Sequence, residues 1–193
     1  MSDEPIRYLI LPGWHGSGPD HWQTHWESLL PNSKRVEQAD WELPLRADWV
    51  ARLERHIGAE PGPVVLIAHS LGCVTVAHWA AQAAPALHSR VLGALLVAPA
   101  DVERDGCALP LRNFAPIPCQ TLGFPSVLVG SSNDPAASQQ RSIELGDAWG
   151  SHTLVLDQAG HINTAAGYTR WEEGFVYLYQ LQTRIEKHRR LFA

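Results

Sequence analysis

Short runs of apolar residues recur along the chain, and they alternate with segments in which apolar residues return every three or four positions. The short runs are nearly continuous, as expected for strands of a parallel sheet that is covered on both faces. They predict five buried strands and a weaker sixth near an edge (Arg35–Gln38), the five being Tyr8–Leu11, Val64–Ala68, Val91–Ala98, Ser126–Val129 and Thr153–Leu156.

The segments between these runs predict helices. Leu71–Ala84 is rich in alanine, which suits a helix packed close to a sheet. The other helical stripes are Trp22, Trp26 and Leu29, then Trp49, Leu53 and Ile57, and on a long final helix Trp171, Phe175, Leu178 and Ile185. Strands that alternate with helices predict a three-layer α/β fold, with a mostly parallel sheet of about six strands and helices on both faces. We expect one domain over residues 1–193.

One stretch, Asp101–Gly123, interrupts this alternation. It contains Pro110, Pro116 and Pro118 and shows little helical periodicity. It is also too short to hold a large lid domain. The sequence therefore predicts an irregular connection and a minimal cap over the sheet.

Composition narrows the class of protein. The net charge of -5 argues against a protein that coats a phosphate backbone, so no nucleic-acid partner is expected. No apolar run reaches membrane-spanning length, and the first residues lack the pattern of a signal peptide, so we expect no membrane association and a cytoplasmic protein. The three cysteines fit neither a disulfide framework nor a zinc site.

The strongest chemical signal is the segment Ala68-His69-Ser70-Leu71-Gly72, between a predicted strand and a predicted helix. This is the context of a nucleophile elbow, in which a sharp turn lifts a serine above the sheet. The turn requires small residues two before and two after the serine. Gly72 meets this requirement, and Ala68 adds one methyl group to the usual glycine. The alternative is a polar turn in which Ser70 only caps the helix.

A serine nucleophile needs a base and an acid, which follow it along the chain in this fold. His161 lies in a loop after the last predicted strand and is the candidate base. Asp134 follows Ser126–Val129 and is the favoured acid, although an Asp-Pro turn is its structural alternative. Asp101, after the preceding strand, is the rival acid.

An oxyanion would need two N–H donors. One is expected from the backbone of Leu71, directly after the nucleophile. The other is expected from the loop after the first strand, with Trp14 the first candidate and His15 the second.

Two other patterns resemble ligand sites but lack essential residues. The loop at residues 13–18 is not a G-x-G-x-x-G dinucleotide motif, and no acidic residue ends the second strand. His21 and His25 are one helical turn apart but lack the glutamate of H-E-x-x-H and a third ligand. No cofactor and no metal are therefore expected.

Several residue clusters together resemble the small serine hydrolase family that contains the retinoblastoma-binding-protein hydrolases and the bacterial YdeN-like proteins. The clusters span nearly the whole chain and are Leu11-Pro12-Gly13, His21-Trp22, Asp40-Trp41, Ala68–Cys73, Leu96–Pro99, Phe124–Ser126, Ser132–Pro135, Gly160–Asn163 and Trp171. The resemblance implies an α/β-hydrolase domain with a minimal cap and a triad of Ser70, Asp134 and His161. A Leu-x-Cys-x-Glu segment is absent from the sequence, so retinoblastoma-protein binding is not carried over.

The sequence thus predicts a serine hydrolase that cleaves a small ester, thioester or amide through an acyl-enzyme. Its partner would be a small acyl substrate. The alternative is a catalytically idle protein that keeps the fold and uses its pocket or surface for binding.

Overall fold

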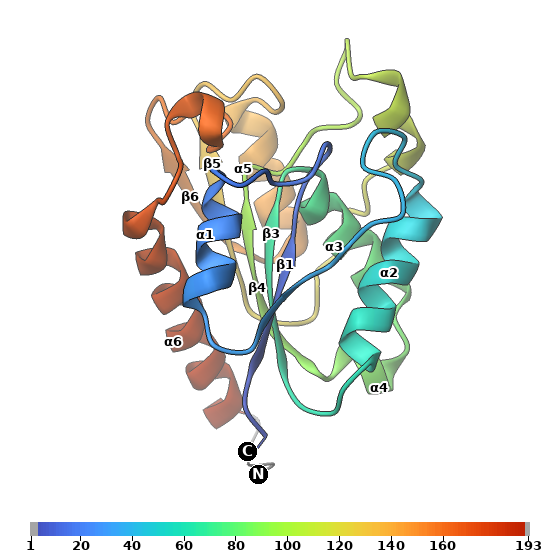
Figure 1. Cartoon of the computed structure of the whole chain (residues 1–193), viewed down its shortest axis with the longest axis vertical. Coiled ribbons are helices and arrows are strands. Elements are labelled where there is room, and N and C mark those ends of the chain that lie inside the picture. Colours follow the sequence, from blue (N-terminus) through green and yellow to red (C-terminus); the bar gives the residue numbers. More distant parts are fainter. Residues whose placement is uncertain (1–3, 192–193) are drawn as a thin grey trace.

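A single sheet of six parallel strands forms the centre of the computed structural model, which describes residues 4–191 (Figure 1). Leu66 in the middle of the sheet is in register with Leu9 on one side and Ala94 on the other. The spatial order is β2-β1-β3-β4-β5-β6. The strands are β1 (Arg7–Leu11), β2 (Ser33–Arg35), β3 (Val64–His69), β4 (Val91–Val97), β5 (Ser126–Ser131) and β6 (His152–Leu156).

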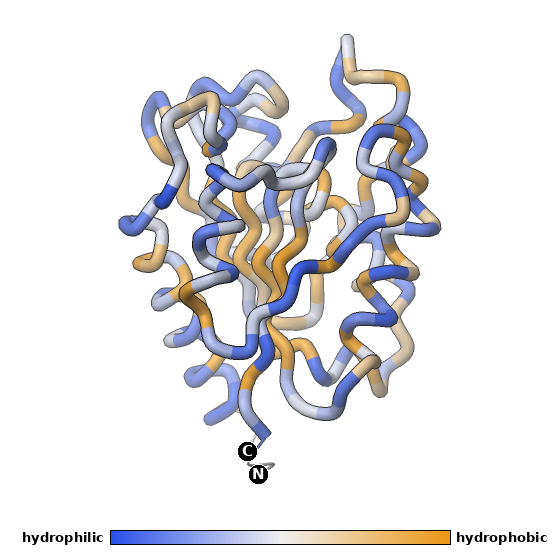
Figure 2. The backbone as a smooth tube through the Cα atoms, viewed as in Figure 1, coloured by the Kyte–Doolittle hydropathy of each residue, from blue (hydrophilic) through white to orange (hydrophobic). Residues whose placement is uncertain are grey.

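Helices cover both faces of this sheet, as the alternating pattern predicts (Figure 1). Residues of α1 (Trp22–Leu29) and α6 (Phe175–Leu191) share one core cluster with one set of alternate strand residues. Residues of α2 (Arg46–Gly58), α3 (Leu71–Gln82) and α5 (Gln139–Trp149) share the other cluster. A short helix, α4 (Pro85–His88), follows α3. Figure 2 shows the strands as the most hydrophobic part of the backbone, between helices of mixed hydropathy.

Two sequence predictions need correction. The edge strand is Ser33–Arg35 rather than Arg35–Gln38. Its pairing with β1 begins at Ser33, so backbone pairing defines this strand and the single apolar residue Val36 does not. Trp171 does not belong to the final helix. Its φ of 45° is left-handed, so it precedes the short turn η3 (Glu172–Gly174), and α6 begins only at Phe175.

The strand order contains a switch point. β1 lies between β2 and β3, so the chain leaves β1 toward one edge of the sheet and returns to its other side. The helix after β1 covers one face and the helix after β3 covers the other. In open α/β sheets this arrangement leaves a crevice at the carboxyl ends of the two strands, where ligands bind.

The proline-rich connection at residues 101–123 does not form a separate lid. It holds one short helix, η1 (Leu109–Phe114), whose Leu111 and Phe114 are buried in the core. The ring of Phe114 meets Trp49 of α2 edge-on, and the side chain of Asn113 bonds the carbonyl of Pro44. The cap is therefore minimal, as expected. No helix within residues 4–191 combines the length and the apolar character needed to cross a membrane.

The turn from β3 into α3 predicts the effect of one added methyl group. A Cβ at Gly72 would lie 2.4 Å from the carbonyl oxygen of Leu11, which is backbone and cannot move aside cheaply. We therefore expect Gly72→Ala to lower the free energy of unfolding by about 2 kcal/mol or more, as overpacking does. Urea denaturation measures this change. Gly18→Ala is the control, because a Cβ there meets nothing within 4 Å and should change stability little. Equal effects of the two substitutions would contradict the close approach.

Candidate active site

Ser70 occupies a strained turn between β3 and α3. Its φ of 55° and ψ of -120° are unusual for a residue with a side chain. The turn is held by the Ser70 N–H, which donates to the carbonyl of Val97 on β4. The Ser70 side chain makes no capping bond to α3, so the alternative of a simple helix cap does not describe it. The hydroxyl instead points to a histidine.

The structure brings Ser70, His161 and Asp134 together in one chain of hydrogen bonds. The Nε2 of His161 lies 2.9 Å from Ser70 Oγ. Its Nδ1 lies 2.9 Å from each carboxylate oxygen of Asp134. A carboxylate can only accept, so Nδ1 carries a proton and Nε2 is free to accept from the serine hydroxyl. The Asp134 side chain is 1% exposed and that of His161 is 17% exposed, so the Asp134 carboxylate is almost inaccessible to water.

Asp101, the rival acid, is held elsewhere. Its carboxylate accepts from the backbone N–H of Glu103 and lies 3.4 Å from Nε of Arg141. Arg141 also forms an ion pair with Glu103, and a looser one with Glu144. These contacts join the connection at residues 101–123 to α5. They leave Asp101 with a structural partner rather than with His161.

The loop that carries His161 is fastened to the loop that carries Asp134. The N–H groups of Gln158, Ala159 and Gly160 donate to the side-chain oxygens of Ser132, Ser131 and Asn133, at 2.8, 3.0 and 2.7 Å respectively. Three successive amides thus meet three successive polar side chains. This role was not predicted from the sequence, although the cluster Ser131–Asn133 just before Asp134 was the visible signal.

Two further histidines near His161 were also missed as members of the site: His69 packs against His161, and His21 packs against His69. The ring of His69 lies between the rings of His21 and His161, with centroids 4.9 Å from each. Burial is the main cause that lowers the pKa of His21 to about 4, with help from the charges of Arg35 and His161. Burial also lowers the pKa of His69 well below its usual value. Both rings are therefore neutral near pH 7.

The ring of His21 has a structural role at the start of α1. The Nδ1 of His21 accepts from the N–H of Gln23 at 3.2 Å and so caps the start of α1. Among residues 4–191, no group of three or more His, Cys, Asp or Glu side chains is arranged to hold a metal ion.

The loop after β1 lies against Ser70, the candidate nucleophile. A Cβ at Gly13 would come within 2.7 Å of Ser70 Cβ, so only glycine fits there without a shift. The N–H of His15 donates to the carbonyl of Trp41 at 3.1 Å and is therefore occupied. Within residues 4–191, the backbone N–H groups of Trp14 and Leu71 donate to no backbone carbonyl. The indole of Trp14 donates to the carbonyl of Glu42, which fixes the loop to the segment after β2.

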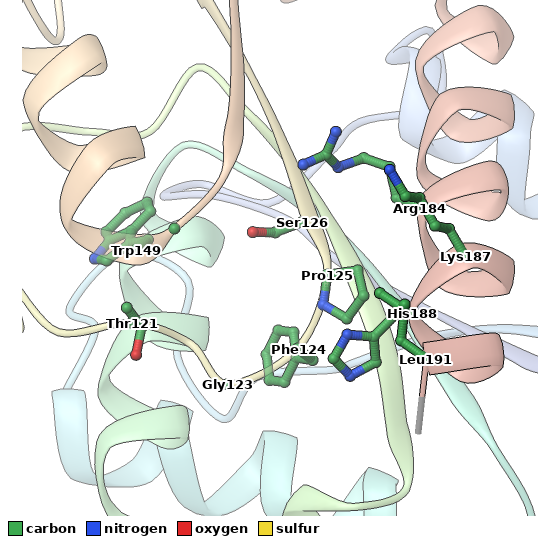
Figure 3. A pocket seen from close by; sticks show the side chains of 11 residues that line it. Thr121, Gly123, Phe124, Pro125, Ser126, Trp149, Arg184, Lys187, His188 and Leu191 are labelled. Atoms are coloured by element: carbon green, nitrogen blue, oxygen red, sulfur yellow. The ribbon is translucent and has the colours of Figure 1, made fainter. Parts of the chain in front are cut away.

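A cavity of about 490 Å³ lies away from this site, at the opposite end of β5 (Figure 3). Its walls are Trp149 and Thr121 on one side and Arg184 and Lys187 of α6 on the other, with Pro125 between them. Ser70, His161 and Asp134 do not line this cavity. The candidate active site is instead the hydrogen-bonded group of Ser70, His161 and Asp134 at the carboxyl ends of the strands.

A parallel sheet with a serine on the strand-to-helix turn, and a histidine and an aspartate on later loops, defines an α/β-hydrolase. The chain belongs to the serine hydrolase family, whose model matches residues 8–180. No protein with a curated description matches the chain in sequence.

Solved structures support this assignment. A protein described as a YdeN-like hydrolase from Pectobacterium atrosepticum is 31% identical over 94% of this chain and 91% of that chain, with a TM-score of 0.79. The YdeN protein of Bacillus subtilis is 16% identical, with 93% and 100% of the two chains covered and a TM-score of 0.76. The carboxylesterase CesB of Bacillus subtilis shares the fold at 13% identity, over 94% and 84% of the two chains, with a TM-score of 0.60. The resemblance to YdeN-like serine hydrolases is confirmed.

Proposed function

We propose that this hydrolase cleaves a small ester, thioester or amide with Ser70 as nucleophile, His161 as general base and Asp134 as the acid that orients the base. The observation that carries the proposal is the continuous chain of hydrogen bonds from Ser70 Oγ through His161 to Asp134, each at 2.9 Å. Such a chain activates a hydroxyl that is a weak nucleophile by itself.

In the acylation step, Ser70 Oγ attacks the carbonyl carbon of the substrate while its proton passes to Nε2 of His161. The resulting imidazolium is stabilised by the Asp134 carboxylate at Nδ1. The tetrahedral intermediate then collapses. Its bond to the leaving group breaks, and the leaving group takes the proton from Nε2, which leaves an acyl ester on Ser70.

Deacylation repeats these steps with water. His161 takes a proton from a water molecule, whose oxygen attacks the acyl carbon. The bond to Ser70 Oγ breaks, and the serine oxygen recovers a proton from Nε2. The products are the free acid and the original enzyme, so no cofactor is needed for the balance of atoms or electrons.

The negative charge on the carbonyl oxygen needs donors in both steps. Leu71 and Trp14 are the proposed oxyanion donors through their backbone N–H groups. Leu71 directly follows the nucleophile, and Gly13 brings the Trp14 loop against Ser70. His15 is less suited because its N–H is bound to Trp41.

The proposed substrate is small or shallowly bound. The connection at residues 101–123 is the insertion that could cover Ser70, but its buried residues Leu111, Phe114, Ile117 and Leu122 belong to the core beneath it. Leu109 is the one large apolar side chain of this connection that stays exposed, so the connection offers little apolar surface with which to enclose a long acyl chain.

Ser70→Ala tests the nucleophile. We expect hydrolysis of p-nitrophenyl acetate to fall by roughly 10⁴-fold or more, because the members of a triad act as a unit. Labelling by a fluorophosphonate probe should disappear, while circular dichroism and the urea midpoint stay close to those of the wild type. A folded variant that keeps its activity would rule out Ser70. A wild-type protein that neither labels nor hydrolyses esters, thioesters or amides would favour the idle binding protein.

Asp134→Asn and Asp101→Asn separate the two candidate acids. In Asp134→Asn, a neutral amide replaces the carboxylate and no longer holds the required tautomer of His161 or stabilises its charge, so kcat should fall by about 10³- to 10⁴-fold. Asp101→Asn weakens only the contact with Arg141, and kcat should change by less than about threefold. The measurement is kcat in parallel assays of both variants. A larger loss at Asp101 would move the acid to the end of β4.

A series of p-nitrophenyl esters from acetate to palmitate tests the open site. Each methylene that is fully buried contributes about 0.8 kcal/mol, and an uncovered site gains much less than this. We therefore expect kcat/KM to be highest for short chains, with no activation at a lipid interface. A steady rise toward long chains, or a jump when the interface is added, would show that residues 101–123 close over the substrate.

A further inference from the structure

We propose that α1 is a brace for the catalytic histidine, and that Trp22 and His69 are positioning residues that hold the His161 loop through two consecutive backbone carbonyls. The Nε1–H of Trp22 donates to the carbonyl of Ile162 at 3.0 Å. The Nε2 of His69 lies 2.9 Å from the carbonyl oxygen of His161 and donates to it, because a carbonyl oxygen can only accept. This inference rests on the proposed role of His161 as base.

The loop needs such a brace because its backbone is strained. Ile162 has a φ of 46°, in the left-handed region that a β-branched residue rarely adopts. Residues held in such conformations persist only when their surroundings over-determine them. The Ile162 side chain is fully buried, and its N–H closes a turn onto the carbonyl of Ala159. The indole of Trp22 fixes the remaining polar group of this residue.

The indole that makes this bond is itself immobile. Trp22 is fully buried, and its ring packs edge-on against Trp26 and Trp171. Trp26 lies one turn later on the same face of α1, and its indole donates to the carbonyl of Arg170. The helix therefore holds the segment after the histidine at two points, at Ile162 itself and at Arg170, which precedes Trp171. Ile162 and Trp171 both have left-handed backbones.

The same helix is fixed to the strands that position the nucleophile. The side-chain amide of Gln23 is fully buried and donates to the carbonyls of Leu11 on β1 and Ile67 on β3, each at 3.1 Å. Its oxygen accepts from the hydroxyl of Ser17 in the loop after β1. One helix thus sets the His161 loop against the strand that leads to Ser70.

These contacts of α1 set the position of His161 relative to Ser70. The base must lie within hydrogen-bond reach of the hydroxyl, and a displacement of about 1 Å can cost about 100-fold in rate. If the carbonyl of Ile162 is released, the strained loop can relax and move Nε2 of His161 away from Ser70. The loss should appear in kcat rather than in KM, since neither Trp22 nor His69 is proposed to bind the substrate.

Trp22→Phe tests the brace, because it removes the N–H donor and keeps an aromatic ring. Trp149→Phe is the matched control: Trp149 is also fully buried and also donates its indole N–H to a backbone carbonyl, that of Pro118 at 2.8 Å, but away from the site. Both variants should lower the urea midpoint by similar amounts. We expect kcat to fall about 10- to 100-fold in Trp22→Phe, with KM within about threefold, and to change less than about twofold in Trp149→Phe. The rate of fluorophosphonate labelling should follow kcat.

A pair of variants at His69 tests the second carbonyl and serves if Trp22→Phe does not fold. His69→Gln keeps a side-chain N–H donor, whereas His69→Leu does not, so His69→Gln should retain at least about tenfold more kcat. His88→Leu is the control, because His88 also bonds a backbone carbonyl, that of Leu122, far from His161.

The outcomes separate the brace from the function itself. Wild-type protein that reacts with the probe, together with equal kcat in Trp22→Phe and wild type, would overturn the brace and leave the triad intact. Equal losses of kcat in Trp22→Phe and Trp149→Phe would also overturn the brace, since they would indicate a general loosening of the fold. Equal kcat in the folded His69→Gln and His69→Leu variants would overturn it as well. Wild-type protein that does not react at Ser70 would overturn the proposed function first.

Discussion

The close approach of two backbones at the switch point is the constraint on which the rest of the site depends. The turn after β3 reaches the end of β1 so nearly that a methyl group at Gly72 would collide with the carbonyl of Leu11. A methyl group at Gly13 would collide with the side chain of Ser70 in the same way. This contact raises Ser70 above the sheet and puts the N–H groups of Leu71 and Trp14 on adjoining turns. The proposed nucleophile and its proposed oxyanion donors are therefore consequences of one packing condition.

A second condition is electrostatic. The proposed mechanism creates a cation on His161 next to the imidazole of His69, which in turn packs against that of His21. Burial lowers the pKa of both His21 and His69, so neither ring carries a charge near pH 7 that would oppose the imidazolium. The charge in hydrogen-bond contact with His161 is the Asp134 carboxylate, which is nearly inaccessible to water and so acts through a medium of low dielectric constant. His21 and His69 can therefore pack near His161 without adding a positive charge to the site.

The parts of the site that depend on strand order were predictable from the sequence, and the parts that depend on loop backbone were not. Ser70, Asp134 and His161 follow three parallel strands, whose carboxyl ends meet at one edge whatever the loops do. The bond from Trp22 to Ile162 joins residues 140 positions apart and ends on a carbonyl, which carries no side-chain signature. The left-handed backbone of Trp171 was missed for a similar reason, because its apolar side chain fits the helical stripe and only the main chain departs from it.

Backbone strain is concentrated where the chemistry is proposed. Non-glycine residues with left-handed φ follow the carboxyl ends of four strands: His15 after β1, Ser70 after β3, Ala98 after β4 and Gln158 after β6. Each such residue costs of order 1–3 kcal/mol, so together they oppose folding appreciably. The opposing term is the buried sheet, whose central strands are almost inaccessible to solvent on both faces. A regular core of this kind can hold irregular loops in place, and the loops need that support because the geometry that orients Ser70 and His161 is not the one their own backbones prefer.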